Sequence, residues 1–200
     1  IRWIDQKLNE YFNKLYKTKD DYIIASDTDS VYINMAPLVK MTGATDKNKI
    51  VKALDKFCSE RLEPYITKCY DELGNYMNVY ENKMVMKREA IADKGIWTAK
   101  KRYILNVHNS EGVQYPEPKL KIMGIEAVKT STPLPCRDKL KESFKVIMGG
   151  DQKEMKEFIV NFRRDFELLP PEDIAFPRSV NGINKYGDTT SIYKKGTTMH

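Results

Sequence analysis

The feature that most constrains the fold is a pair of aspartates placed between two apolar runs. Residues 22–26 and 30–35 are rich in Ile, Val and Tyr, which favours β-strands. Only Asp27, Thr28 and Asp29 connect these runs, and so short a connection permits only a hairpin. Like charges this close repel each other, and apolar surroundings make it costly to keep both ionised. We therefore expect a positive partner from outside the chain, such as a metal ion or a metal-bound phosphate.

The remaining pattern before residue 130 predicts a mixture of helices and strands. Apolar residues recur at helical spacing in residues 1–17 and 47–80, and Pro64 is expected to kink or break the second helix. Further strands are expected at residues 83–91, 101–108 and 120–123, with a turn at Asp93-Lys94-Gly95 and with Gly124 ending the last strand.

Helical signals dominate after residue 130. Thr132 is expected to cap a helix whose first residue is Pro133 and which ends at Gly149-Gly150. Asp151 and Glu154 have the spacing of a capping box for a second helix. The residues expected to be buried by that helix are Met155, Phe158, Ile159, Phe162 and Phe166, and residues 171–200 show no strong period. We predict an α+β fold, with an antiparallel sheet backed by helices in residues 1–130 and a mainly helical part in residues 131–200.

Composition disfavours membrane-spanning, disulfide-rich and zinc-binding proteins, and it weakly favours a polyanionic partner. The 200 residues include 34 basic and 28 acidic side chains, a net charge of +6, which favours a polyanionic partner only weakly. No apolar run is long enough for a bilayer, and no signal-peptide pattern opens the chain. Cys58, Cys69 and Cys136 form no CxxC motif and only two His are present, which disfavours disulfide and zinc frameworks. Because no Met starts the chain and no polar tail ends it, we expect a fragment of a longer protein.

Three interpretations of Asp27 and Asp29 are open from the residues alone. The first is an ordinary turn, in which Asp is common. The second is a phosphatase of the haloacid-dehalogenase type, because "DTDSV" fits Asp-x-Asp-x-Val with the first Asp as nucleophile and the second as acid/base. That fold needs a doubly wound parallel sheet, which a second strand directly after Ser30 disfavours. The third is a two-metal phosphoryl-transfer site, in which Mg²⁺ binds carboxylates and substrate phosphates.

The stretches "SDTDSVY" and "WTAKKRYILNV" together resemble motifs of family B DNA polymerases. "SDTDSVY" is similar to the Asp-Thr-Asp-Ser motif of their palm domain, with Ala25 and Ser26 in place of the usual Tyr-Gly. The Ser side chain is therefore expected beside the turn, where it changes the local backbone. "WTAKKRYILNV" follows and is similar to their Lys-x-Tyr motif, which contacts the primer strand near its 3′ end. In a strand, Lys101 and Tyr103 would share one face.

Further stretches extend this resemblance over essentially the whole chain. The segments "RLEPYI", "MKREAIADKGIWTAKKRY" and "EPKLKIMGIEAVKTSTP" resemble the replicative DNA polymerases of T-even-type tailed phages. The resemblance implies that residues 1–130 are the C-terminal part of a palm domain and that residues 131–200 begin a thumb.

The resemblance also implies roles for individual residues. Asp29 would bind catalytic metal directly, and Asp27 would be its auxiliary partner. Lys101 and Tyr103 would contact the primer. The other residues expected on the DNA path are Lys100, Arg102, Lys119 and Lys121. Glu89 is either a further carboxylate near the site or a salt-bridge partner of a neighbouring basic residue.

In the full-length enzyme, two Mg²⁺ ions, primer–template DNA and deoxynucleoside triphosphates would meet at this site. The primer 3′ hydroxyl would attack the α-phosphorus and pyrophosphate would leave. A sliding clamp would bind through other regions, and the protein would act in the cytoplasm of an infected bacterium, without membrane attachment or secretion. The family's Asp-x-x-Ser-Leu-Tyr-Pro motif, its fingers helix and its exonuclease region do not occur in these 200 residues. We therefore expect the chain alone to be inactive. The alternative to an enzyme is a basic DNA-binding module with Asp27 and Asp29 as turn residues.

Overall fold

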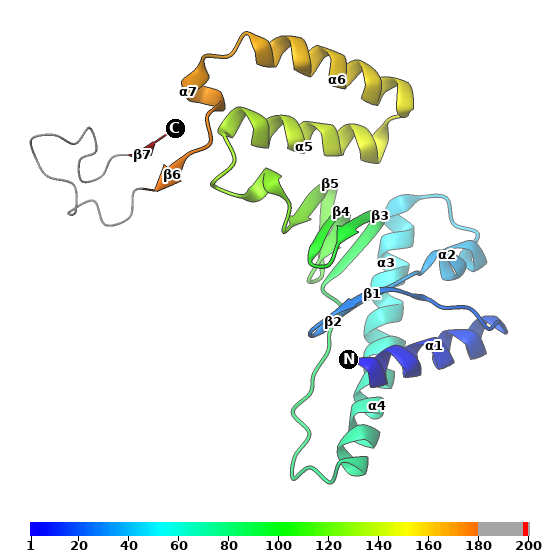
Figure 1. Ribbon diagram of the computed structural model, residues 1–200. Coiled ribbons are helices and arrows are strands. Elements are labelled where there is room, and N and C mark those ends of the chain that lie inside the picture. The colour runs from blue at the N-terminus through cyan, green and yellow to red at the C-terminus, as the bar shows by residue number, and fades with distance from the viewer. Residues whose placement is uncertain (180–197, 200) are drawn as a thin grey trace, which may run out of the picture. The chain divides into compact units, whose positions relative to one another are not determined.

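The computed structural model describes residues 1–179, 198 and 199, which form an α+β fold as predicted (Figure 1). The helices are α1 (Arg2–Tyr16), α2 (Ala36–Thr42), α3 (Lys47–Phe57), α4 (Glu63–Tyr76), α5 (Leu134–Gly149), α6 (Gln152–Glu167) and α7 (Pro171–Ile174), with a π-helical segment η1 (Cys58–Leu62) and a 3-10 helix η2 (Glu126–Val128). The strands are β1 (Ile23–Asp27), β2 (Ser30–Ile33), β3 (Ala90–Ala99), β4 (Arg102–Ser110), β5 (Val113–Met123), β6 (Arg178–Ser179) and β7 (Thr198–Met199). None of the helices within the described ranges combines the length and the apolar character needed to cross a membrane.

The chain divides into two compact units that are interleaved in sequence. The first unit contains residues 1–93 and 107–119, and the second contains residues 94–106 and 120–200. Strands β3, β4 and β5 each contribute residues to both units. The assignment of residues 1–130 to a palm and of residues 131–200 to a thumb stays a prediction. Residues 180–197 and 200, at the end of the predicted thumb, lie outside the described residues.

The main core of the first unit is built on α1, the helix predicted at residues 1–17. Ile4, Leu8 and Phe12 recur every four residues, so they share one face of the helix, and all three are fully buried. Residues from the base of the β1–β2 hairpin and from the η1–α4 segment complete this cluster: Tyr22, Cys58, Leu62, Ile66, Cys69 and Tyr70. The hairpin is therefore anchored at its base in this core.

The long helical pattern of residues 47–80 is interrupted before Pro64. Residues of η1 follow α3 directly, and the Glu63 N–H donates to the Cys58 carbonyl five residues earlier. Pro64 then lies in the first turn of α4, where its missing N–H costs little. The chain therefore stays helical through Pro64, and the expected irregularity is the π-helical turn that ends at Leu62, before α4 begins at Glu63.

The sheet β3-β4-β5 corrects three sequence predictions. Residues 83–89 lie outside any helix or strand, and β3 runs straight through the predicted turn at Asp93-Lys94-Gly95. The turn instead lies at Lys100-Lys101, where Lys101 has a φ of 61°. Lys101 is therefore a turn residue, and its predicted place in a strand on the face of Tyr103 is wrong.

Packing explains why Gly95 does not make a turn. A Cβ at Gly95 would lie 2.7 Å from a Trp97 ring carbon and 2.8 Å from Leu105 Cδ2. The residue therefore needs to be small because two side chains cover it within the sheet. Its neighbour Lys94 donates to the Met148 carbonyl, and this contact holds the strand against α5.

Strand β5 is longer than the predicted strand at residues 120–123. Pro116 and Pro118 lie inside it, which the sequence alone disfavours for a strand. In the described sheet β5 pairs with β4 alone, so it has one open edge. Because the two prolines are two residues apart, their missing N–H groups fall on the same edge of the strand.

The helices of the second unit follow their predicted ranges with one shift. Helix α5 begins at Leu134, so Pro133 is the residue before the helix and Thr132 provides no side-chain cap. The predicted end at Gly149-Gly150 is confirmed, and Asp151 caps α6 by accepting the N–H groups of Lys153 and Glu154.

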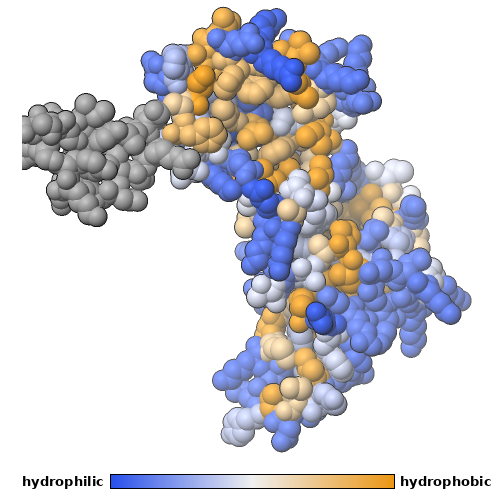
Figure 2. Space-filling view, in the orientation of Figure 1, coloured by the Kyte–Doolittle hydropathy of each residue, from blue (hydrophilic) through white to orange (hydrophobic). Residues whose placement is uncertain are grey.

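The apolar stripe of α6 is less covered than predicted. None of its residues is fully buried, and Ile159 is 40% exposed. Apolar side chains accordingly reach the surface over α5 and α6 (Figure 2), among them Ile147 and Val160. The core of the second unit instead lies between α5 and the sheet, where Ile104, Ile125, Ala127, Phe144 and Met148 are buried together.

Candidate active-site hairpin and nucleic-acid interface

The predicted hairpin is present, and its tip presents Asp27 and Asp29. Strands β1 and β2 are antiparallel, and Asp27 is paired with Ser30 as the last pair before the turn. Thr28 and Asp29 form the turn itself. Asp29 is exposed and Asp27 is half-buried. The rigid pairing of the two strands therefore fixes two carboxylates at an accessible point of the first unit.

Hydrogen bonds within the turn orient Asp27. Its Oδ1 accepts from the Thr28 N–H at 2.9 Å and from the Thr28 hydroxyl at 3.2 Å. These bonds hold the carboxylate beside the turn. They hold the Asp27 carboxylate in place whether or not a cation binds, so the turn interpretation and the metal interpretation share this geometry.

Ser26 was expected beside the turn, but it lies within the strand that leads to it. It lies inside β1, paired with Val31, and its side chain is exposed. The irregularity in the pairing falls between Ile23 and Ala25, further from the tip. The Ala25-Ser26 pair in place of Tyr-Gly is therefore accommodated in extended backbone.

Two more of the predicted site residues lie in the first unit. The Glu89 carbonyl accepts from the Glu111 N–H at 2.7 Å, just before β3 begins. Among residues 1–179, 198 and 199, no group of three or more His, Cys, Asp or Glu could hold a metal ion, so Glu89 does not complete such a group with Asp27 and Asp29. The Lys119 amine lies 4.3 Å from the centre of the Tyr115 ring, a cation–π contact on β5.

The Lys-Lys-Arg-Tyr motif lies in the second unit, around the β3–β4 turn. Lys100 and Lys101 are exposed, and Lys121 is half-buried on β5. The Tyr103 ring lies 6.3 Å from the Trp97 ring, which places an aromatic pair on the two strands that meet at this turn. Basic groups beside an aromatic surface are typical of nucleic-acid contacts.

The Arg102 guanidinium is engaged within the protein. Its Nε donates to the Gly124 carbonyl at 3.0 Å, and its Nη2 pairs with the Glu126 carboxylate. Sequence reasoning grouped Arg102 with the DNA-contacting residues and did not single out Glu126. No short sequence motif links the two residues, because 24 positions separate them along the chain.

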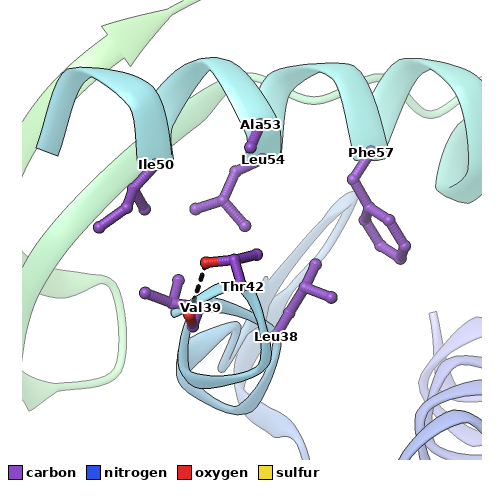
Figure 3. A pocket seen from close by; sticks show the side chains of 7 residues that line it. All are labelled: Leu38, Val39, Thr42, Ile50, Ala53, Leu54 and Phe57. Carbon is purple, nitrogen blue, oxygen red and sulfur yellow. Dashed lines mark hydrogen bonds between the residues drawn. The ribbon is translucent and has the colours of Figure 1, made fainter. Parts of the chain in front are cut away.

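A small apolar pocket lies apart from these residues, between α2 and α3 of the first unit (Figure 3). It has a volume of about 160 Å³, and its lining residues are Leu38, Val39, Thr42, Ile50, Ala53, Leu54 and Phe57. Its one hydroxyl, on Thr42, donates to the Val39 carbonyl at 2.7 Å. The pocket therefore presents no charged group and no nucleophile for chemistry.

The sheets disfavour the phosphatase interpretation. Strands β1 and β2 pair antiparallel, and two-residue turns join β3 to β4 and β4 to β5, which also requires antiparallel pairing. The carboxylate pair thus lies at a hairpin tip and not at the end of a parallel strand, where the phosphatase fold would need it.

Comparison with known proteins identifies relatives over almost the whole chain. The chain is 39% identical over 200 residues to the DNA-directed DNA polymerase of Enterobacteria phage T4, an alignment that includes 94% of this chain. It is 40% identical to the DNA-directed DNA polymerase of Escherichia phage RB69 in an alignment 198 residues long that covers 93% of this chain. The chain spans 22% of the length of each relative. No family model matches the sequence. The predicted resemblance to the DNA polymerases of T-even-type phages is therefore confirmed.

Proposed function

We propose that this chain is the part of a family B DNA polymerase that carries one carboxylate wall of the active site and the primer-contacting strand pair. The observation that carries the proposal is the Asp27–Asp29 hairpin tip, within a chain that aligns over 93–94% of its length with two phage DNA polymerases. On this proposal, residues 1–130 belong to the palm and residues 131–200 begin the thumb. The whole protein extends a DNA primer on a template, in the cytoplasm of an infected bacterium.

The residues at the hairpin tip fit Mg²⁺. This ion prefers oxygen ligands and is usually held by one or two carboxylates together with substrate phosphates. Asp29, which is exposed, would hold it directly, and Asp27, which is already oriented by Thr28, would assist. Bound Mg²⁺ would neutralise charge on the transferring phosphate. The upstream carboxylate and the triphosphate contacts would come from other parts of the polymerase.

Lys101 and Tyr103 would place the primer end. The lysine supplies charge for a phosphodiester, and the tyrosine supplies a ring and a hydroxyl for the sugar edge. Lys100, Lys119 and Lys121 would line the duplex path. These residues act on position rather than on bond breaking, so their loss should weaken primer placement more than chemistry. The other partners are deoxynucleoside triphosphates and, through other regions, a sliding clamp.

Fluorescence anisotropy with a labelled primer–template tests this proposal. With Mg²⁺ at two salt concentrations, the chain should bind the primer junction more tightly than blunt duplex. Lys101→Ala/Tyr103→Ala should lower the affinity for the junction by about tenfold. The slope of the logarithm of the binding constant against the logarithm of the salt concentration should become shallower by about one, since one phosphate contact is lost.

A matched control removes the same two residue types elsewhere. Lys83 and Tyr80 lie between α4 and β3, and Tyr80 is fully exposed, so Lys83→Ala/Tyr80→Ala should leave the junction preference unchanged. Equal affinity for junction and blunt duplex in the wild-type chain would contradict the proposal and favour the basic DNA-binding module.

A further inference from the structure

The β3–β4 turn that carries Lys101 packs against Gly124, the residue that follows β5. Lys101 itself has a φ of 61°, which is unusual for a residue with a side chain. Gly124, just after β5, has a φ of 67° and lies so close that a Cβ there would be 2.2 Å from the Lys101 carbonyl oxygen. The turn therefore packs directly against the Gly124 backbone.

Glu126 is the polar group that joins these two segments. Its carboxylate pairs with Arg102, whose Nε also donates to the Gly124 carbonyl at 3.0 Å. It accepts from Lys129 at 3.0 Å as well. The Lys129 hydrogen bond, followed by smaller contributions that include Arg102, lowers the pKa of the Glu126 carboxyl. The carboxylate is therefore charged at neutral pH and bridges two cations.

The backbone that carries Glu126 is fixed by the core. Its neighbours Ile125 and Ala127 are 8% and 0% exposed, and both pack in the cluster that includes Ile104 of β4. Glu126 therefore has an exposed side chain on a backbone that buried neighbours hold in place. A residue that positions a turn needs such a support.

We propose that Glu126 is a positioning residue that, through Arg102 and the Gly124 backbone, sets the conformation of the Lys100-Lys101 turn for contact with the primer. The proposal rests on the proposed function, and it assigns Arg102 to the protein side of the interface and not to DNA. Glu126 touches no DNA in this role.

The sign of the expected effect separates positioning from simple electrostatics. Removing a negative charge from a basic protein should strengthen its attraction to the DNA phosphates. If Glu126 positions the turn, its loss should do the opposite at the primer junction. Glu142 is the matched control, because it accepts from Lys139 at 2.9 Å and has a side-chain exposure of 50%, against 49% for Glu126.

The test compares Glu126→Gln and Glu142→Gln in the complete 200-residue chain by two measurements. Hydrogen exchange should become faster at residues 100–103 in Glu126→Gln only. The ratio of junction affinity to blunt-duplex affinity, measured by anisotropy, should fall about two- to fivefold in Glu126→Gln, as expected for loss of one surface ion pair, and should stay constant in Glu142→Gln. Gly124→Ala is a second variant that should loosen the same turn by steric overlap.

The two measurements also separate failure of this inference from failure of the proposed function. Unchanged exchange at residues 100–103 in Glu126→Gln would overturn the inference whatever the DNA data show. Faster exchange with an unchanged junction preference would overturn the positioning role, while the proposed function would stand if Lys101→Ala/Tyr103→Ala still lost that preference. If that double variant also kept it, the proposed function would fail.

Discussion

At the scale of single residues, the tip that carries the aspartate pair is more open to solvent than its sequence context suggests. The apolar neighbours Ile23 and Val31 pack against the core of the first unit, whereas Asp29 is exposed. Water therefore screens much of the repulsion between the two carboxylates, and Thr28 satisfies Asp27 locally. The chemical case for a bound cation rests on two accessible carboxylates at one rigid tip, and burial adds little to it.

The cysteines give a prediction about pH. Burial raises the pKa of the Cys58 thiol to about 11 from an ordinary value of 9.0. At pH 8 this lowers its thiolate fraction by about 100-fold, so Cys58 should react with iodoacetamide far more slowly than Cys136, which is half-buried. Because the raised pKa favours the neutral thiol, the stability that it contributes is present below pH 9 and is lost as the pH rises towards 11.

Mass spectrometry of the alkylated peptides measures this order of reactivity. In urea all three cysteines should react at similar rates, which is the control for intrinsic differences. Equal rates for Cys58 and Cys136 in the folded chain would show that the core built on α1 does not bury the Cys58 thiol as described.

At the scale of elements, the sequence predicts helices better than strands. The apolar spacing of α1 lies within that helix, and the capping signal of α6 lies at its first residues. Both can therefore be recognised from the local sequence. The small size of Gly95 is required by Trp97 and Leu105, and the second of these lies on a neighbouring strand. Without knowledge of the strand pairing, a glycine inside a strand is therefore predicted to form a turn.

The same distinction applies to the candidate site: the part within one short segment was predictable, and the part that joins distant segments was not. The Asp27–Asp29 tip is defined by one short segment, and its hairpin was expected from the two apolar runs alone. Glu126 became visible only when the structure placed it beside Arg102, 24 residues earlier in the chain. Spacing along the sequence gives no period for such a contact, so no pattern could have predicted it.

The cap of α6 provides a prediction at this scale. The Asp151 carboxylate accepts the N–H groups of Lys153 at 2.8 Å and Glu154 at 2.9 Å. Asp151→Ala leaves both donors without this partner and should lower the free energy of unfolding by about 1 kcal/mol. Asp151→Asn keeps an acceptor and should cost much less. Urea denaturation of both variants checks this, and equal losses would mean that the charge matters and the cap geometry does not.

At the scale of the whole molecule, the chain carries only part of what a two-ion reaction needs. It spans 22% of the length of its two phage relatives. Within the described residues no group of three or more potential metal ligands occurs, and the hairpin tip offers two carboxylates. Two carboxylates without substrate phosphates are a weak site for Mg²⁺, which gives up its water reluctantly.

The 200-residue chain alone should therefore not elongate a primer. Incubated with primer–template, deoxynucleoside triphosphates and Mg²⁺, it should give no extension above a control without protein, whereas the phage T4 polymerase should extend the same primer. The Asp29→Asn variant decides the meaning of any extension that is seen. Extension that this variant abolishes would show that one carboxylate wall suffices for nucleotidyl transfer, against our prediction. Extension that persists in the variant would place the activity away from the hairpin tip and contradict the role proposed for Asp29, because a two-ion reaction at that tip requires its carboxylate.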